Sequence, residues 1–186
     1  MSTSKNIVLA VTGASGSVYA ARFIERAMEL PGISLHLIFS DTAKEVWAHE
    51  TGLPLPEGLM DNHSFNSPFC SGSAAADCMV VLPCSMGTMA RIAAGLADCA
   101  IARIADVQLK EKKKLILVPR EAPLNLIHIG NMQTLAQAGA VIFPASPSFY
   151  SKPASIGGMV DAFVSRILQT AGVHDLEDEY KWNIKS

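Results

Sequence analysis

Five short runs of apolar residues alternate with segments of helical periodicity along this chain of 186 residues. The runs, rich in Val, Ile and Leu, cover residues 6–11, 34–39, 79–83, 115–119 and 140–144. Strands that are apolar on both faces belong inside a parallel sheet covered by helices on both sides. Apolar residues recur with the helical period over residues 20–28 and 156–171. The pattern therefore predicts a single α/β domain, a doubly wound parallel sheet in a three-layer α/β/α arrangement.

Polar residues and glycines gather directly after these runs. They are residues 12–16, 40–42, 84–88, 120–123 and 145–150. Ligands of an open parallel sheet bind in the crevice outside the carboxyl ends of its strands, so one crevice collects all five segments. The small residues at 13–16 and the loop at 85–88 each precede a helix, the second predicted over residues 89–97, and helix starts bind anions through backbone N–H groups. Two such starts at one edge favour a phosphate-bearing cofactor.

One segment departs from the alternation. Residues 52–77 contain several Pro, Gly and Ser and show little periodicity. A loop of this length inside a compact domain is usually functional or disordered. We expect the domain to cover residues 1–173 and a polar tail, in which Trp182 is isolated, to cover residues 174–186.

The charge content limits the possible partners. Lys and Arg number 15, Asp and Glu number 17, and together they make up 17% of the chain, where about 25% is usual. No stretch approaches the ~20 apolar residues of a membrane-spanning helix, so we attribute the scarcity of charge to surface covered by other subunits. The absence of a basic stripe argues against nucleic acid as a partner. The N-terminus has no leader-like apolar core, and a cytoplasmic location is expected.

Cysteine and histidine spacing argues against two further kinds of site. The four Cys form no CxxC pair and the five His form no HExxH motif, so we expect reduced thiols and no metal. Residues 13–16 also permit a nicotinamide-dependent dehydrogenase, with Asp41 as the ribose partner. That alternative lacks the third glycine of its motif, and no Tyr is followed by Lys four residues later.

Several charged positions are candidates for a ligand site or a subunit interface. Arg103, Asp106 and Lys110 fall on one face of a predicted helix, where an exposed salt-bridged stripe is the alternative. Arg166 lies at the edge of the apolar stripe of the last helix and is predicted to point along an interface. Arg120 and Glu121 end an apolar strand, where burial of charge is costly unless a ligand or a partner satisfies it.

Seven segments match, in order, the motifs of a known family. They are TGASGS at residues 12–17, Glu50, SGS at 71–73, PCSMGT at 83–88, RIADVQLKE at 103–111, VPREAPLNLIHIGNM at 118–132 and FYSKP at 149–153. On these motifs the chain resembles the UbiX-type flavin prenyltransferases, formerly described as aromatic acid decarboxylases. The resemblance extends over residues 7–173, which is nearly the whole chain.

The resemblance implies a flavodoxin-like (Rossmann-like) fold that binds reduced FMN and dimethylallyl phosphate. It implies that the prenyl group is joined to flavin N5 and C6 without a metal ion. The product, prenylated FMN, is the cofactor of UbiD-type decarboxylases, which would be the partners that receive it. By the same resemblance, FMN would be held by Gly13, Ala14, Ser15, Ser40, Ser85, Met86, Gly87, Thr88, Arg103 and Arg120.

Catalytic and donor-binding residues follow from the same resemblance. Gly72, Lys110, Arg120, Tyr150 and Arg166 would surround the prenyl phosphate, and the catalytic residues would be Ser15, Glu50, Lys110 and Glu121. Cationic groups such as Lys110 stabilise the charge of the leaving phosphate, while Ser15 and the two carboxylates would handle protons. The family also implies a homododecamer whose sites lie where subunits meet.

Two other activities remain open on the sequence alone. One is an FMN-dependent cysteine decarboxylase, which would share the fold and the FMN site. Enzymes of that kind use a catalytic His early in the chain, whereas His36 is predicted within a strand, and the prenyl-phosphate residues would have no purpose in them. The other is a non-catalytic flavin carrier for a partner decarboxylase.

Overall fold

The computed structural model describes residues 4–150 and 152–173. The tail expected at residues 174–186, including Trp182, lies outside the described residues. The elements in chain order are β1 (Lys5–Val11), α1 (Ser17–Glu29), β2 (Ile33–Phe39), α2 (Asp41–Thr51), the 3₁₀ turns η1 (Pro68–Cys70) and η2 (Gly72–Ala74), β3 (Cys78–Cys84), α3 (Met86–Ala93), α4 (Ala100–Lys110), β4 (Lys114–Pro119), α5 (Leu126–Gln137), β5 (Val141–Ile142) and α6 (Ile156–Thr170).

The strands form one parallel sheet in the order β2-β1-β3-β4-β5. This order reverses direction between β1 and β3, because the chain first moves outward to β2 and then returns past β1 to the other side. It is the flavodoxin-like order, and its ligand crevice lies at the switch point, outside the carboxyl ends of β1 and β3. The predicted doubly wound fold is confirmed.

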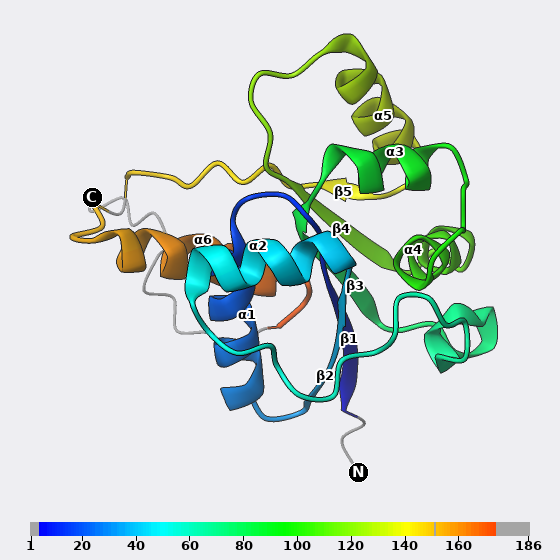
Figure 1. Cartoon of the computed structure of the whole chain (residues 1–186), viewed down its shortest axis with the longest axis horizontal. Coiled ribbons are helices and arrows are strands. Elements are labelled where there is room, and N and C mark those ends of the chain that lie inside the picture. The colour runs from blue at the N-terminus through cyan, green and yellow to red at the C-terminus, as the bar shows by residue number, and fades with distance from the viewer. Residues whose placement is uncertain (1–3, 151, 174–186) are drawn as a thin grey trace, which may run out of the picture.

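Helices cover both faces of the sheet, with α1, α2 and α6 on one side and α3, α4 and α5 on the other (Figure 1). Alternate residues of β1 enter different cores: Ile7 and Leu9 pack with the helices of the first side, and Val8 and Ala10 with those of the second. All four are fully buried. This two-sided burial explains why the strand runs are continuously apolar rather than alternating.

Two predicted elements differ in extent from the observed ones. The helix expected at residues 89–97 is α3, Met86–Ala93, which starts one turn earlier and ends before Gly95, whose φ of +68° is a helix-terminating conformation. The last strand is shorter than the expected residues 140–144, because Pro144 has no N–H to donate to the ladder. The residues after β5 still run beside β4, since the amide of Ala145 donates a hydrogen bond to the carbonyl of Pro119 at 2.9 Å.

The long segment at residues 52–77 is attached to the domain at both sides of the sheet's carboxyl edge. Met60 pairs with Ile38 of β2 in an isolated parallel bridge. Asn62 is buried and accepts a bond from the amide of Ala100 through its backbone carbonyl, at 2.9 Å. It also accepts one from the amide of Ile101 through its side chain, at 3.1 Å. The segment is therefore an ordered wall rather than a free loop.

Candidate functional site

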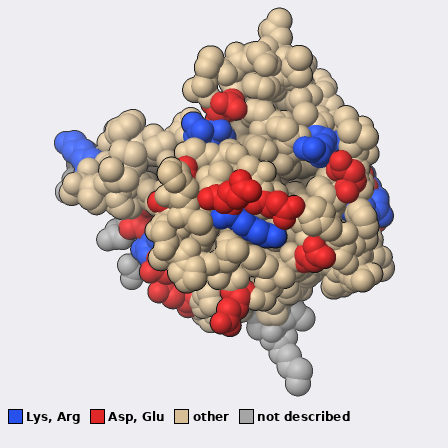
Figure 2. All heavy atoms as spheres, in the orientation of Figure 1, with Lys and Arg blue, Asp and Glu red and all other residues tan. Residues whose placement is uncertain are grey.

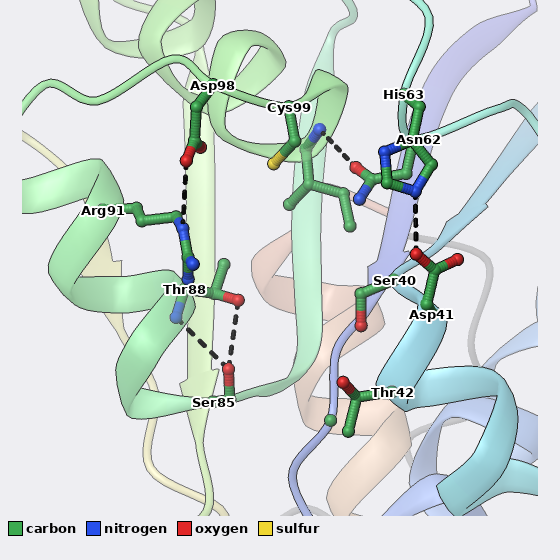
Figure 3. Close-up of a pocket in the computed structure, with 12 residues that line it drawn as sticks. Ser40, Asp41, Thr42, Asn62, His63, Ser85, Thr88, Arg91, Asp98 and Cys99 are labelled. Atoms are coloured by element: carbon green, nitrogen blue, oxygen red, sulfur yellow. Dashed lines mark hydrogen bonds and ion pairs between the residues drawn. The ribbon is translucent and has the colours of Figure 1, made fainter.

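A cavity of about 390 Å³ opens at the switch point of the sheet. Small-molecule sites commonly have volumes of roughly 300 to 1,000 Å³. Its wall contains residues from the ends of β1, β2 and β3 and from the segment 52–77, as Figure 3 shows. The lining residues are Gly13, Ser40, Asp41, Thr42, Asn62, His63, Ser85, Thr88, Arg91, Asp98, Cys99 and Ile101.

Two helices, α2 and α3, begin at this cavity with a serine N-cap. Ser40 Oγ accepts a hydrogen bond from the Ala43 amide at 3.1 Å, and Ser85 Oγ accepts one from the Thr88 amide at 3.2 Å. An N-cap side chain satisfies one of the four orphan N–H groups of a helix start, so further amides remain for a ligand. These two starts, with their hydroxyls, suit an anionic group.

The helix start expected at residues 13–16 is filled from within the chain. The carboxylate of Glu50 accepts bonds from the amides of Gly16, at 2.9 Å, and Ser17, at 2.7 Å, at the N-terminus of α1. Glu50 on α2 thus supplies an anion to these two amides from within the chain, and contact of the ligand with the rest of the first loop stays a prediction. The two helix starts at the cavity that suit an external anion are therefore those of α2 and α3.

The same contacts set the protonation of Glu50. Burial by itself raises the pKa of this carboxyl, but hydrogen bonds from the Ser15 hydroxyl and from the amides of Gly16 and Ser17 outweigh it. The net pKa lies below the usual value. Glu50 is consequently an ionised acceptor next to a hydroxyl, as a group that takes up a proton must be.

Thr12 joins the two loops on either side of the switch point. Its buried hydroxyl donates to the Pro83 carbonyl at 2.8 Å and accepts from the Ser85 amide at 2.7 Å. Next to it, Gly13 lies so close to Thr42 that a Cβ at this position would be 2.5 Å from Thr42 Cγ2. These contacts fix the spacing between the first loop, α2 and α3.

Arg120 and Glu121 lie beside the first loop but are exposed, not buried. Arg120 Nε donates to the carbonyl of Ser15 at 3.2 Å, which brings the end of β4 to the loop after β1. Glu121 accepts a bond from the neighbouring amide of Ala122 at 3.1 Å. The pair follows directly on the end of β4 at Pro119, at the carboxyl edge where it was expected. Its exposure within one chain leaves both side chains accessible to a ligand or a partner subunit, and such a contact stays a prediction.

The cations expected at the donor phosphate do not meet this cavity within one chain. Lys110 is the last residue of α4 and forms an ion pair with Glu111, and a Cβ at Gly72 would collide with both side chains. The cavity touches α4 only at its first turn, and Lys110 lies roughly 15 Å further along the helix. Arg166 is exposed on α6 and contacts Gln169 at 3.1 Å.

Arg103 and Tyr150, two further residues expected at the site, also lie outside the cavity wall. Arg103 forms an ion pair with Asp106 at 2.8 Å and donates to the carbonyl of Cys70 at 3.1 Å, so the salt-bridged helix face is confirmed for this pair. Tyr150 is 46% exposed on the loop before α6.

Sequence reasoning missed half of the cavity wall, namely Asn62, His63, Arg91, Asp98, Cys99 and Ile101. Thr42 falls within the polar segment 40–42, which does point to the cavity. His63 is hydrogen-bonded to Asp41, and Asp98 forms an ion pair with Arg91. The only sequence signal for Asn62 and His63 was their place in the long segment 52–77, and none marked the others.

The parallel sheet, its switch-point cavity and the two serine-capped helix starts define a flavodoxin-like α/β protein with a site for a phosphate-bearing ligand. The family model Flavoprotein matches residues 1–170. The flavin prenyltransferase UbiX of Thermoplasma acidophilum is 43% identical over 173 residues, covering 90% of this chain and 94% of that protein. The chain belongs to the Flavoprotein family and, within it, to the UbiX-type flavin prenyltransferases.

Solved structures agree with this assignment. The crystal structure of AnUbiX in complex with FMN and dimethylallyl pyrophosphate superimposes with a TM-score of 0.90 at 38% identity, covering 97% of this chain and 98% of that one. A dodecameric FMN-dependent UbiX-like decarboxylase from Escherichia coli O157:H7 gives 0.91 at 34% identity, covering 96% and 99%. The cysteine decarboxylase TvaF, at 17% identity and a TM-score of 0.63, shares the fold alone.

Two kinds of feature are absent from the described residues. No three His, Cys, Asp or Glu side chains among them form a group that could hold a metal ion. None of the helices in this part of the chain is both long and apolar enough to cross a membrane.

Proposed function

We propose that this protein joins the dimethylallyl group of dimethylallyl phosphate to N5 and C6 of reduced FMN and releases phosphate. The observation that carries the proposal is the switch-point cavity, in which Gly13, Ser40, Ser85 and Thr88 meet. The resemblance assigns these same residues to FMN. The product would be prenylated FMN.

FMN fits the chemistry of this wall. The free first-turn amides of α2 and α3, including those of Met86 and Gly87, suit its phosphate, and the hydroxyls of Ser40 and Thr88 suit phosphate and ribityl oxygens. The other FMN residues would be Ala14 and Ser15 in the first loop, Arg103 and Arg120.

The donor phosphate requires residues from more than one subunit. Lys110, Gly72 and Arg166 lie apart from the cavity of their own chain, so they would serve the cavity of a neighbour. There they would join that neighbour's Arg120, which lies beside the first loop, and Tyr150 in surrounding the donor phosphate. A homododecamer, as in the E. coli relative, would supply such neighbours. Within the site, Lys110 and Arg166 would stabilise the charge that develops on the departing phosphate.

Proton handling is the proposed role of three groups at the first loop. Bond formation at C6 of the flavin ring requires the loss of a proton, and Glu50 is ionised and hydrogen-bonded to the hydroxyl of Ser15. This arrangement suits a relay from the hydroxyl to the carboxylate. Glu121, which is exposed beside Arg120, would act once a neighbouring subunit closes the site.

The other two activities have less support. His36 lies on β2, where its ring contacts Phe69 and bonds to Asn6 Oδ1 at 3.1 Å, and it does not line the cavity. His36 therefore offers no catalytic His to a cysteine decarboxylase, and the histidine that does line the cavity, His63, is bonded to Asp41 at 2.7 Å. A pure flavin carrier would not need the cationic residues. We propose a cytoplasmic enzyme whose product passes to a UbiD-type decarboxylase.

Phosphate release tests this function. Under anaerobic conditions with reduced FMN and dimethylallyl phosphate, the protein should liberate phosphate, and it should liberate none without the flavin. Lys110→Ala should lower the rate by about 100-fold or more, while Lys113→Ala, a nearby lysine outside the site, should leave it unchanged. An FMN-loaded protein that releases no phosphate would favour the carrier.

A further inference from the structure

Arg91 is the one Lys or Arg among the described residues that line the switch-point cavity. It lies on α3, one turn after the helix start that suits a phosphate. The other ionisable side chains of the wall are Asp41, His63, Cys99 and Asp98. Figure 3 shows the Arg91–Asp98 pair on one side of the pocket and the His63–Asp41 pair on the other, with serine and threonine hydroxyls between them.

The two carboxylates of the wall differ in their partners. Asp41 bonds to His63 at 2.7 Å and to Lys44 at 3.0 Å. Hydrogen bonds from these two groups lower the pKa of Asp41. Asp98 is paired with Arg91 alone among the described residues, through a single contact from Nε at 3.3 Å. A phosphate monoester carries a charge of about −1.5 to −2 near neutral pH, so its entry adds negative charge to a wall with one permanent cation.

The guanidinium of Arg91 is held loosely enough to change partner. Its side chain is 50% exposed and that of Asp98 is 58% exposed, and ion pairs with such exposure are weak. Its second bond runs from Nη1 to the Gly87 carbonyl at 3.4 Å, near the limit for a hydrogen bond. Within the described chain these bonds engage Nε and Nη1, which leaves Nη2 for a ligand. Arg binds phosphate oxygens in a bidentate manner that Lys does not reproduce.

We propose that Arg91 exchanges its contact with Asp98 for the phosphate of FMN and is the residue through which the protein distinguishes FMN from riboflavin. The assignment rests on the proposed function, because it takes FMN as the ligand of the cavity. Arg91 orients and neutralises the phosphate, while the amides of α2 and α3 supply the remaining hydrogen bonds. Asp98 holds Arg91 at the cavity before the ligand arrives.

Flavin titration of the flavin-free protein by calorimetry tests this role. FMN and riboflavin differ only in the phosphate, so each variant is titrated with both. Arg91→Ala should weaken FMN binding by roughly tenfold to 100-fold and leave riboflavin binding within about twofold of wild type. Arg91→Lys, which keeps the charge and loses the fork, should fall between wild type and Arg91→Ala. Asp98→Asn should tighten FMN binding, since it removes the competing carboxylate.

The control is Arg26→Ala, which removes a cation of the same kind from α1, where Arg26 bonds to Ser165 outside the cavity. It should leave both affinities unchanged. Wild-type FMN affinity in Arg91→Ala, or an equal loss for FMN and riboflavin, would overturn the assignment, because Arg91 would then not act on the phosphate. Wild-type protein that binds no FMN would instead contradict the proposed function, and this assignment with it.

Discussion

At the scale of single residues, the site depends on polar groups that join segments far apart in the sequence. Glu50 accepts a hydrogen bond from the amide of Ser17, 33 residues away, and Thr12 accepts one from the amide of Ser85, 73 residues away. Each of these two side chains accepts, in place of a hydrogen bond from water, one from a backbone amide at the edge of the cavity. The geometry of the cavity is thus encoded in a few side chains that do not touch most of its volume.

The pH dependence of stability tests the state of Glu50. Its lowered folded-state pKa means that ionised Glu50 stabilises the fold above the unfolded value of about 4.3. That contribution disappears as the pH falls through the lower folded value. Glu50→Gln should therefore reduce the free energy of unfolding at pH 7, by about 1 kcal/mol or less because the side chain is exposed, and make no difference in stronger acid. Urea unfolding across pH measures this, with Glu45→Gln on the same helix as the control. A difference independent of pH would contradict it.

The buried hydroxyl of Thr12 makes a separate prediction. Thr12→Val keeps the shape but leaves the Ser85 amide without its acceptor, at a cost of about 1 to 3 kcal/mol. Thr12→Ser keeps both bonds and should cost much less. Thermal unfolding and FMN titration of the two variants provide the measurement. Equal stability and equal affinity of the Val and Ser variants would show that the hydroxyl does not connect the loops.

At the scale of elements, four helices begin at or beside the ligand edge, and each start has a different occupant. Glu50 fills that of α1 and Asn62 fills that of α4, while Ser40 and Ser85 cap α2 and α3 and leave amides for a ligand. The strands and the apolar helix faces were predictable from the sequence, because burial imposes a period on neighbouring residues. The occupants of α1 and α4 were not, since Asn62 lies 39 residues from Ile101 and no local pattern connects them.

The same limit applies to the cavity wall. Ser40 and Ser85 could be found because they follow strands, and a position after a strand is a local property. Asn62 and His63 lie in the segment 52–77, whose contacts with α2 and α4 arise only in the folded chain. The observed helix ends also differ from the predicted ones. In α3 the bounds are set by the N-cap at Ser85 and the turn at Gly95, and not by the apolar period.

The contact of Asn62 with α4 predicts a loss of stability when it is removed. Asn62→Ala takes away the side-chain cap from the Ile101 amide and should cost about 1 kcal/mol. Asn62→Asp keeps an acceptor and should retain most of the stability. Urea unfolding of the flavin-free protein gives the comparison. If Asn62→Ala unfolds at the wild-type midpoint, the segment 52–77 does not stabilise α4.

At the scale of the whole molecule, charge is scarce where apolar residues are exposed. Helix α5 projects from the body of the chain (Figure 1) and contains no Lys, Arg, Asp or Glu, and Figure 2 shows the projection as largely uncharged. Leu126 is 84% exposed and Ile127 is 72% exposed at its start. Exposed apolar side chains grouped in this way mark a protein interface. The low charge of the sequence thus belongs in part to a surface that other subunits would cover.

Assembly is therefore expected to depend on the start of α5. Leu126→Asp should reduce the size of the assembly in native mass spectrometry, because it places a charge in the apolar surface between subunits. The fold of the single chain should survive, because Leu126 is exposed and does not belong to the core. Gln133→Glu adds a charge to the same helix without removing apolar surface and should assemble as wild type does. Phosphate release should fall with the loss of assembly, since Lys110 and Arg166 are proposed to serve a neighbouring cavity. Full activity of a monomeric Leu126→Asp protein would contradict the shared site.

The mass of the flavin after turnover shows directly whether the protein prenylates FMN. The protein is incubated without oxygen with reduced FMN and dimethylallyl phosphate, and the flavin is then extracted and analysed by mass spectrometry. The extracted flavin should be heavier by one dimethylallyl unit in place of hydrogen, with the bonds to N5 and C6 closing a further ring. Recovery of unmodified FMN from a folded, FMN-loaded assembly would contradict it.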